Sequence, residues 1–444
     1  MARSAEELKK LAIAAIDRHA DEIKALGDSI YSEPELGYKE FKTAAKFTSF
    51  LDRLGVSYKD KVGITGVIAP FKGKESKVRV AVMGELDAVV VPGHVAADPV
   101  TGAAHCCGHH AMIAGIAGVA CALADTDIMN DLSGDVVVMA VPAEEYVEIE
   151  YRNQLKNEGK ISLLGGKQEF IALGVMDDID MMIMQHTMAT EGEETYSPIK
   201  AVSGGVGNGM IGKLIQYKGK EAHAGGAPHM GINALNAAEI GLMAMHAQRE
   251  TFKDEDRIRV HPIMTKGGDL VNVIPADVRL ETYVRGASAQ AILDASAKVT
   301  RAFEAGGMAV GAETIITDIP GYMPGISYPE LEDVIYKNLV MLLGEEHAAP
   351  ASAERGGGSS DCADIQAIMP AVQANIGGAS GTFHGESYRM VDSDLAYLVA
   401  AKALACTAID LLAGGAQKGL HIKETCKPPM TKEQYLREWG KLDI

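Results

Sequence analysis

The sequence predicts an α/β protein with a mixed, largely parallel sheet flanked by helices, and a smaller α+β unit inserted into it. Two observations lead to this fold class. Several short, continuous apolar runs end in polar residues, which is typical of strands covered on both faces. Residues 201–318 follow a different order of elements. With 444 residues, the chain is also long enough for two domains.

The first predicted elements are helices, because residues 5–27 and 39–54 carry apolar side chains at helical spacing. Three apolar runs then predict buried strands, which lead into Gly84-Glu85-Leu86-Asp87, Pro142-Ala143-Glu144-Glu145 and Gln185-His186. Sites in open α/β sheets form beyond the carboxyl ends of the strands. Three strands that deliver candidate ligands at this end therefore predict a functional site there.

The inserted unit is expected over residues 201–318, where the pattern predicts the order β-α-β-β-α-β of the ferredoxin-like fold. Its predicted elements are strand 208–218, helix 231–248, strands 257–264 and 271–284, helix 288–306 and strand 307–317. The larger domain is then expected to comprise residues 1–200 and 319–444. Its later part should contain helices at 332–343 and 391–414 and an apolar segment at 365–376.

Composition limits the classes of partner. The chain has 42 Lys and Arg against 60 Asp and Glu, a formal net charge of −18. Nucleic acids and anionic membranes select basic surfaces, so neither is an expected partner. The apolar run 111–124 is shorter than the roughly 20 residues of a membrane span, and residues 1–10 lack an apolar signal core. The six cysteines are irregularly spaced, which predicts reduced thiols and a cytoplasmic location.

Candidate metal ligands are concentrated in residues 104–110, just ahead of an apolar helix rich in small residues. Thiol and imidazole groups, followed further along the chain by adjacent carboxylates, are what a hydrolytic metal site requires. We interpret Cys107 and His109 as ligands. The alternative is a buried thiol beside a histidine that begins a helix. Cys106 and His105 are weaker candidates, and His110 is interpreted as a supporting residue next to a ligand.

The adjacent carboxylates Glu144 and Glu145 are expected to have different roles. Neighbouring side chains on an extended segment point in opposite directions, so one can bind metal while the other exchanges protons with the attacking water. A solvated strand end is the plainer alternative. His186 and His384 become ligands only if the metal site exists. Asp87 is interpreted as the orienting partner of a metal-bound histidine.

Two loops rich in glycine are candidate substrate contacts. His223 lies in a small-residue loop that is either a simple turn or a place where the backbone approaches a substrate. The segment 356–361 resembles an anion-binding loop, in which the backbone N–H groups of Gly357 and Gly358 face a carboxylate. It lacks the Gly-Lys-Ser/Thr sequence of a nucleotide loop, so a phosphate ligand is discounted.

Taken together and in this order, the motifs resemble the dimetal aminoacylase/carboxypeptidase family. The similarity is greatest to its amidohydrolase branch, which includes hippurate, auxin-conjugate and p-aminobenzoyl-glutamate hydrolases. The matching segments are Glu33–Gly37, Gly84–Ala88, Cys107–His109, Pro142–Glu145, His223–Pro228 and Gly268–Pro275. They lie within residues 30–395. Three features depart from the family pattern: His110, the extra thiol Cys106 and the charged segment 146–164.

The resemblance implies a catalytic domain of the dimetal exopeptidase type, with the inserted unit as lid and dimerisation domain. It implies two divalent ions, held by Cys107, His109, Glu145, His186 and His384. It further implies Glu144 as the general base and His223 as a residue that reaches the active site of the partner subunit in a homodimer. Asn272 and Arg285 would hold a substrate carboxylate.

The expected reaction is hydrolysis of the amide C–N bond of a small N-acyl-amino-acid, aminobenzoyl-glutamate-like or dipeptide-like substrate. Thiolate and imidazole ligands favour zinc, cobalt or nickel, with zinc first, and the carboxylate keeps manganese among the candidates. Three alternatives stay open. They are a thiol hydrolase with Cys107 as nucleophile, a non-catalytic binding protein, and hydrolytic deamination or other C–N cleavage at the same dimetal site.

Overall fold

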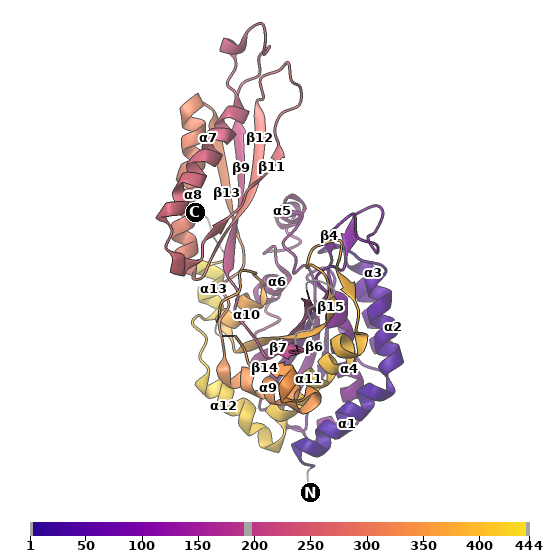
Figure 1. The fold of residues 1–444 in the computed structure, drawn as a ribbon. Helices are drawn as coiled ribbons and strands as arrows, with labels where there is room; N and C mark the ends of the chain where they lie inside the picture. The colour runs from indigo at the N-terminus through magenta and orange to yellow at the C-terminus, as the bar shows by residue number, and fades with distance from the viewer. Residues whose placement is uncertain (1–2, 191–197, 353, 441–444) are drawn as a thin grey trace. The chain divides into compact units, whose positions relative to one another are not determined.

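The computed structural model divides the protein into two compact units (Figure 1). It describes residues 3–190, 198–352 and 354–440. The larger unit consists of the chain up to Val206, Ile326–Glu354 and Asp364–Lys432. The smaller unit consists of Gly207–Gly325, Arg355–Ala363 and the stretch from Glu433.

A nine-stranded sheet forms the centre of the larger unit, in the order β1-β2-β6-β3-β7-β15-β8-β14 with β16 beside β15. Its strands are β1 (Lys59–Val62), β2 (Gly66–Phe71), β3 (Arg79–Glu85), β6 (Asp135–Val141), β7 (Met181–Thr190), β8 (Ala201–Val202), β14 (Ala348–Ala349), β15 (Ala371–Ser380) and β16 (Arg389–Met390). The adjacent strands β6, β3, β7 and β15 are parallel, whereas β2 is antiparallel to β6. The predicted fold class, α/β with a mixed and largely parallel sheet, is confirmed. A separate pair, β4 (Val89–Val90) and β5 (Ala103–Ala104), lies outside this sheet.

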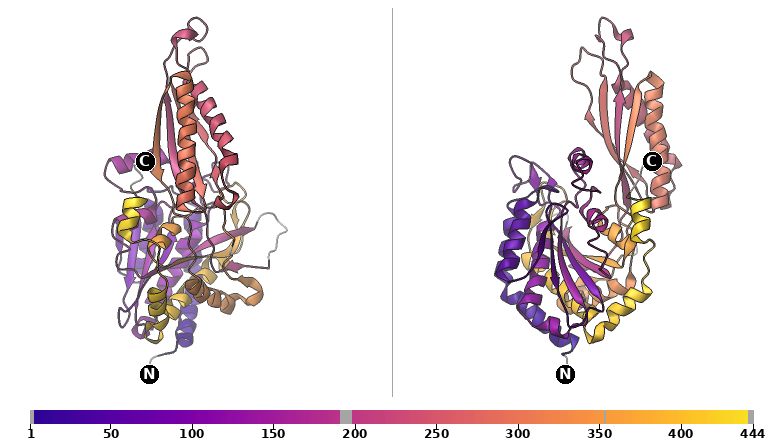
Figure 2. Two further views of the ribbon diagram at one scale, coloured as in Figure 1. Left: turned by 90° about the vertical axis from the view of Figure 1, so that its left-hand side faces the viewer. Right: turned by 180° about the vertical axis from the view of Figure 1, so that it is seen from behind.

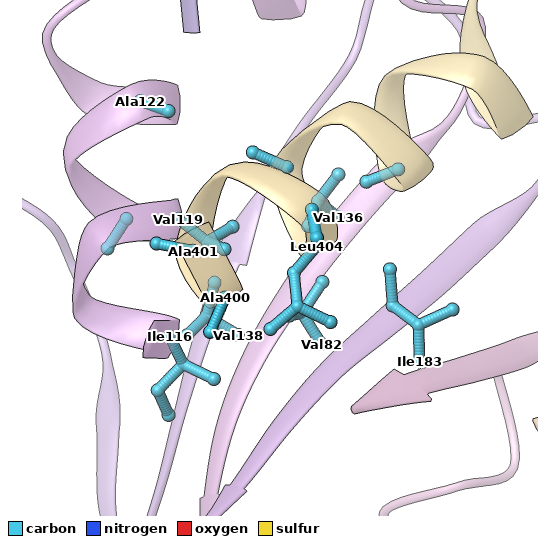
Figure 3. Close-up of a cluster of buried hydrophobic side chains, with 14 of the residues drawn as sticks. Val82, Ile116, Val119, Ala122, Val136, Val138, Ile183, Ala400, Ala401 and Leu404 are labelled. Atoms are coloured by element: carbon cyan, nitrogen blue, oxygen red, sulfur yellow. The ribbon is translucent and has the colours of Figure 1, made fainter. Parts of the chain in front are cut away.

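Both faces of the central strands are buried, as their continuous apolar sequences predict. Val82, Val138 and Ile183 belong to the main hydrophobic cluster, where Figure 3 shows them facing two helices. The neighbouring residues Met83 and Met139 point to the opposite face, because side chains alternate along a strand, and they too are buried. Helices therefore have to cover both sides of the sheet, and Figure 2 shows them there.

The helices of the larger unit are α1 (Ala5–Arg18), α2 (Ala20–Tyr31), α3 (Phe41–Arg53), α4 (His109–Ala124), α5 (Ile149–Asn157), α6 (Gly166–Ala172), α9 (Pro329–Leu343), α10 (Cys362–Ile368), α11 (Ala400–Leu412) and α12 (Gln417–Thr425). Ser4 and Glu7 form a capping box that begins α1. Small residues let α4 and α11 pack closely, since a Cβ atom at Gly118 would lie 2.5 Å from that of Ala401. The stretch Asp394–Leu412 is long and apolar enough to cross a membrane, but 83% of it is buried within the fold.

The smaller unit has an antiparallel five-stranded sheet in the order β10-β12-β9-β13, with β11 beside β12. Its elements are β9 (Gly209–Lys218), α7 (Ala234–Ala247), β10 (Arg259–Val260), β11 (Ile263–Lys266), β12 (Asp277–Gly286), α8 (Ala289–Val310) and β13 (Glu313–Pro320). The order of strands and helices agrees with the predicted ferredoxin-like unit, except that one predicted strand is divided into β10 and β11. The two units have separate apolar cores.

Several boundaries differ from those predicted. The strand expected at 257–264 is divided into β10 and β11 at Pro262, whose ring nitrogen has no hydrogen for the ladder. The helix expected to end at residue 306 continues to Val310, so the strand expected from 307 begins at Glu313. Gly306 is part of the helix because it packs against α7: a Cβ there would lie 2.3 Å from the carbonyl oxygen of Ala237.

The smaller unit also includes segments far from its main stretch in the sequence. The Arg355 guanidinium donates hydrogen bonds to the carbonyl oxygens of Gly207 and Gly325, with 3.0 Å to Gly325. The indole nitrogen of Trp439, in the stretch that follows the start of α13 (Lys432–Glu438), donates to the carbonyl oxygen of Gly321 over 2.8 Å. These contacts explain why residues 355–363 and the chain from Glu433 join this unit.

Candidate metal centre

Side chains from five separate stretches of the larger unit meet beyond the carboxyl ends of its parallel strands. Three overlapping groups have ligand atoms within 4.8 Å of one another: Cys107, His109 and His186; Cys107, Glu145 and His384; Glu85, His109 and Glu144. The first two groups contain all five residues that the resemblance implies as ligands. Cys107 belongs to both, so its sulfur lies between two positions that can each hold an ion.

The distances between individual ligand atoms are short enough for neighbouring residues to bind the same ion. Cys107 Sγ lies 3.3 Å from His186 Nε2, and His384 Nε2 lies 3.1 Å from Glu145 Oε1. His109 Nε2 is 3.0 Å from Glu85 Oε2. Glu85 was not among the residues proposed from the sequence.

The unpaired polar atoms of the cluster fit bound cations. Glu85 Oε2, His109 Nε2 and Glu145 Oε1 are buried without a hydrogen-bond partner among the described residues. Buried polar atoms are normally paired, so three of them facing one small region call for a further binding partner there. Sulfur, imidazole and carboxylate donors together suit zinc and similar divalent metals. The residues present therefore fit divalent ions.

His109 is oriented by its position at the start of α4. Gly108 precedes it with a φ of 90°, and a Cβ at this glycine would lie 2.1 Å from Thr187 Oγ1, so both conformation and space require glycine. The His109 Nδ1 atom is 2.9 Å from the carbonyl oxygen of Asp87 and 3.2 Å from its Oδ1. Nδ1 therefore carries the proton, and Nε2 is left to face the cluster.

Asp87 also positions the second carboxylate of the Glu pair. Its Oδ2 accepts a hydrogen bond from the backbone N–H of Glu145 over 2.8 Å. Asp87 is buried, so it connects the imidazole of His109 with the backbone of Glu145 away from water. This is the place that the sequence interpretation gave to Asp87.

The segment that carries Glu144 and Glu145 has a constrained backbone. Ala143 has a φ of 54°, in the left-handed region that side chains other than glycine rarely adopt. Its N–H donates to Glu40 Oε1 over 2.8 Å, and its carbonyl oxygen accepts a hydrogen bond from Arg152 over 3.0 Å. Burial and the charge of Asp87 raise the pKa of Glu40 to about 7.

Within the charged segment 146–164, Arg152 has a structural role that the sequence did not reveal. It is 1% exposed on α5 and donates hydrogen bonds to the carbonyl oxygens of Ala143, Glu145 and Leu164, with 2.9 Å to Leu164. The buried residues of α5 are Ile149, Arg152 and Leu155, each three positions apart. That spacing places the arginine on the apolar face of the helix and was the available signal.

The two remaining histidines lie on different kinds of backbone. The sequence placed His186 at the end of a strand, but β7 continues to Thr190. His186 lies just beyond Met184, the last residue of β7 that pairs with β3, so its ring is at the edge of the central strands. His384 has a φ of 58°, and its N–H donates to the carbonyl oxygen of Cys106 over 3.0 Å. This bond ties the His384 loop to the Cys107 loop.

Electrostatics separate the titrating groups of the cluster. Burial opposes the charge of His109, but the negative charges of Glu85 and Cys107 prevail and hold the pKa of His109 well above its usual value. Burial also opposes the charge of Glu145, yet the adjacent imidazole of His384 lowers the pKa of Glu145. Burial and the charge of Glu145 hold the pKa of the Cys107 thiol well above its usual value.

Two residues of the same loop lie in other surroundings. Cys106 is buried in a small apolar cluster with Val89 and Tyr388, and burial raises its pKa to about 11. His110 is fully buried, and burial lowers its pKa to about 3. Its ring centroid lies 4.8 Å from that of Tyr31 and 5.4 Å from that of His105. Among the described residues, the ring contacts of His110 are therefore with neighbours outside the three ligand groups.

The candidate substrate residues of the smaller unit form two separate groups. His223 and Asn272 lie on paired segments, where the N–H of Ala224 donates to the carbonyl oxygen of Asn272 over 2.9 Å. Arg285 donates to Ser359 Oγ over 3.0 Å, beside the loop of Gly357 and Gly358. A Cβ at either glycine would meet no described atom within 4 Å, so that backbone is open.

The two groups lie at opposite ends of β12. Asn272 precedes this strand, and Arg285 is its second-last residue. Ten residues in extended conformation span about 30 Å. One substrate carboxylate therefore cannot contact Asn272 and Arg285 of the same subunit.

Comparisons with known proteins agree with this geometry. The model of peptidase family M20/M25/M40 matches residues 81–408. Mouse Xaa-Arg dipeptidase is 27% identical over 452 aligned residues, covering 97% of this chain and 95% of the dipeptidase. A homologue of one component of p-aminobenzoyl-glutamate hydrolase, from Haemophilus influenzae, is 31% identical over 237 residues, covering 50% of this chain and 49% of its own.

A solved structure extends the comparison to the fold. It is a Bacillus subtilis protein described as a dinuclear metal-binding peptidase of the M20 family. The TM-score is 0.62 at 21% identity, with 90% of this chain and 99% of that chain covered. The match spans most of the chain, so the fold has a counterpart among solved structures.

Proposed function

The chain belongs to peptidase family M20/M25/M40 and is a metal-dependent amidohydrolase or peptidase, and from this premise we propose that it hydrolyses the amide bond of a small substrate ending in a free carboxylate. The substrate class is a dipeptide or an N-acyl-amino-acid, which includes aminobenzoyl-glutamate-like compounds. The single observation that carries the proposal is the convergence of Cys107, His109, Glu145, His186 and His384, with the carboxylate of Glu144 beside them.

The two adjacent carboxylates divide the chemistry. Two divalent ions bound here would polarise the scissile carbonyl and lower the pKa of a water towards 7. Glu145 is grouped with Cys107 and His384, which supports it as a ligand. Glu144 Oε2 lies 3.9 Å from His109 Nε2, at the edge of the cluster. Glu144 then accepts the proton of the attacking water and delivers it to the leaving amine.

His223 has the geometry of a hydrogen-bond donor to the substrate. Its Nδ1 accepts hydrogen bonds from the backbone N–H groups of Gly225 over 3.1 Å and Gly226 over 2.9 Å. The neutral ring therefore carries its proton on Nε2, and this N–H is directed away from its own loop. Such a donor stabilises the negative charge that develops on the carbonyl oxygen, and its loss costs about 3 kcal/mol, or roughly a hundred- to a thousandfold in rate.

In a homodimer, the residues at the two ends of β12 could act at two different metal centres. His223 and Asn272 of one subunit would reach the centre of its partner, whereas Arg285 and the Gly357–Gly358 loop would hold the substrate within their own subunit. Exposed apolar side chains near the first end support such a contact. Ile263 is 62% exposed, Leu270 is 65% exposed and Val271 is fully exposed. Exposed apolar groups of this kind mark protein interfaces.

Zinc is the proposed physiological ion, because the shared donor is a sulfur and three of the other four are imidazoles. The proposed location is the cytoplasm. This placement is supported by the free state of all six cysteines, since reduced thiols are the usual condition there.

The reaction can be tested by chelation and refilling. The chain is stripped of metal, refilled with zinc, manganese, cobalt or nickel, and assayed against dipeptides, N-acyl amino acids, aminobenzoyl-glutamate and aryl amines. The proposal expects loss of activity on stripping, recovery with zinc, and cleavage of amides that carry a free carboxylate. Release of ammonia from an amine without amide cleavage would instead identify a deaminase.

The role of Glu144 has its own test. Glu144→Gln should lower turnover by at least a thousandfold while the variant still binds two ions per chain, as measured by elemental analysis. Loss of an ion in this variant would contradict the division of roles between Glu144 and Glu145.

The arrangement across the dimer is tested by mixing inactive variants. His223→Ala and Glu144→Gln chains are each expected to be inactive alone. Unfolded together and refolded, they should regain activity in mixed dimers, because one centre then combines an intact Glu144 with an intact His223 of the partner. The absence of any regain would show that His223 does not act across the dimer.

A further inference from the structure

Glu85 is a buried carboxylate at the cluster that the proposed mechanism does not use. It is the last residue of β3 and is fully buried. Its Oε1 pairs with Lys167 Nζ over 2.5 Å, and Lys167 is fully buried on α6. Its Oε2 faces the other way, towards His109 Nε2, and has no hydrogen-bond partner among the residues that the structure describes.

The distance between Glu85 Oε2 and His109 Nε2 fits two neighbouring ligands on one ion. Zinc binds imidazole nitrogen and carboxylate oxygen at about 2.0 to 2.2 Å. Two such donors on a tetrahedral or octahedral ion are then about 2.8 to 3.6 Å apart. His109 Nε2 and Glu85 Oε2 are 3.0 Å apart, and Cys107 Sγ and His186 Nε2 are 3.3 Å apart.

The ion pair with Lys167 provides a partner for only one of the two carboxylate oxygens of Glu85. Lys167 satisfies one oxygen, and a buried ion pair needs further partners for its remaining lone pairs to offset desolvation. The second oxygen points at the one ring nitrogen of His109 that is left free by Asp87. A cation bound by His109 Nε2 would supply the missing partner for both atoms.

We propose that Glu85 is a further protein ligand to the ion that His109 binds, and that Lys167 holds its other oxygen in place. This inference rests on the proposed metal centre. It adds a third carboxylate-bearing position to that centre, contributed by β3 rather than by the loops after β6 and β15.

Cobalt provides a readout that does not depend on activity. Metal-free protein is titrated with Co²⁺, and its visible absorption bands report the number and type of ligands on each ion. The unsubstituted chain should bind two cobalt ions. Glu85→Gln should bind one of them at least tenfold more weakly with altered visible bands, whereas the second ion binds as before.

The smaller unit offers a matched control. Lys213 and Asp318 form another buried ion pair between a lysine and a carboxylate, and Lys213 Nζ is also 2.8 Å from Thr300 Oγ1. Asp318 belongs to none of the three ligand groups. Asp318→Asn and Glu85→Gln should both lower thermal stability, whereas only Glu85→Gln should change cobalt affinity and absorption.

The double variant Glu85→Gln/Lys167→Met separates a ligand from a purely structural partner. It removes the lysine charge that Glu85→Gln alone would leave buried, so it also serves if that single variant does not fold. Weak binding of one cobalt ion should persist in the double variant. Cobalt affinity and absorption equal to those of the unsubstituted chain, in either variant, would overturn the proposal for Glu85. Failure of the unsubstituted chain to bind cobalt would instead overturn the metal centre itself.

Discussion

Replacement of Arg152 by methionine tests whether a buried arginine holds the loop of the Glu pair. Methionine keeps most of the apolar volume but donates no hydrogen bond, so the carbonyl oxygens of Ala143, Glu145 and Leu164 lose a partner. Each buried acceptor left unpaired costs about 1 to 3 kcal/mol. Relaxation recovers part of this sum, and we expect a net loss of about 3 to 5 kcal/mol in the free energy of unfolding.

The assay combines stability with metal binding. Unfolding in urea is followed by far-ultraviolet circular dichroism, and zinc content is measured after dialysis. Because Glu145 is one of the residues whose backbone Arg152 holds, the variant should also retain less zinc than the unsubstituted protein.

Arg18 provides the comparison, since it pairs with Asp125 on the surface with side chains 55% and 41% exposed. Arg18→Met should change the free energy of unfolding by less than about 1 kcal/mol. If Arg152→Met unfolded at the same urea concentration as Arg18→Met and kept its zinc, Arg152 would not be what fixes the Glu144–Glu145 segment.

Three further predictions concern other parts of the fold. Gly108→Ala should reduce zinc affinity at least tenfold in equilibrium dialysis, because a Cβ there collides with Thr187 Oγ1 and displaces the start of α4; unchanged affinity would show that the loop adapts. Asp277 accepts a hydrogen bond from Gln216, which, with its neighbouring cations, lowers the pKa of Asp277 from 3.8 to about 2. Its stabilisation is therefore complete above pH 4 and is lost as the pH falls towards 2, so urea titrations should show a decline, of about 1 kcal/mol, that Asp277→Asn lacks; a parallel decline in both proteins would contradict this. Trp439→Ala should destabilise the smaller unit by about 3 to 5 kcal/mol in calorimetry, because the indole is buried and hydrogen-bonded; an unchanged transition would show that the C-terminal stretch contributes nothing to that unit.

The sequence predicted the parallel strands well because each is a short, continuous apolar run whose end is marked by polar residues. The runs that lead into Asp87, Glu144 and His186 each proved to be strands of one sheet. The pairing register of these strands could not be predicted, because a continuously apolar strand buries apolar side chains in every register. The sequence places Glu85 just after a strand, whereas in the structure it is the last residue of β3, paired opposite Val141 and facing His109.

Proline and glycine account for most of the misplaced boundaries. Pro262 divides a predicted strand, and Pro370 separates α10 from β15 within the apolar segment expected at 365–376. In contrast, Gly306 does not end its helix, because it provides space for a neighbouring one. The effect of a proline arises from its own backbone, so it can be predicted from the local sequence. The effect of a buried glycine depends instead on a contact with a residue that is distant in the sequence.

Arg152 was missed for a related reason. A charged residue is normally assigned to the surface, and the three carbonyl oxygens that receive its hydrogen bonds lie in segments separated from it by up to twelve residues. Backbone acceptors leave no mark in a sequence, so only the apolar spacing of its helix pointed to its burial.

The length of β12 sets the distance between Asn272 and Arg285. In a working dimer, this strand would separate the contacts that one chain makes with its own substrate from those it lends to its partner. Each residue of a strand adds about 3.3 Å, so deleting one inward–outward pair would draw Asn272 back by about 7 Å. Displacements near 1 Å already cost about a hundredfold in rate. Evolution can therefore exchange the outward-facing side chains of β12 far more freely than it can shorten or lengthen the strand.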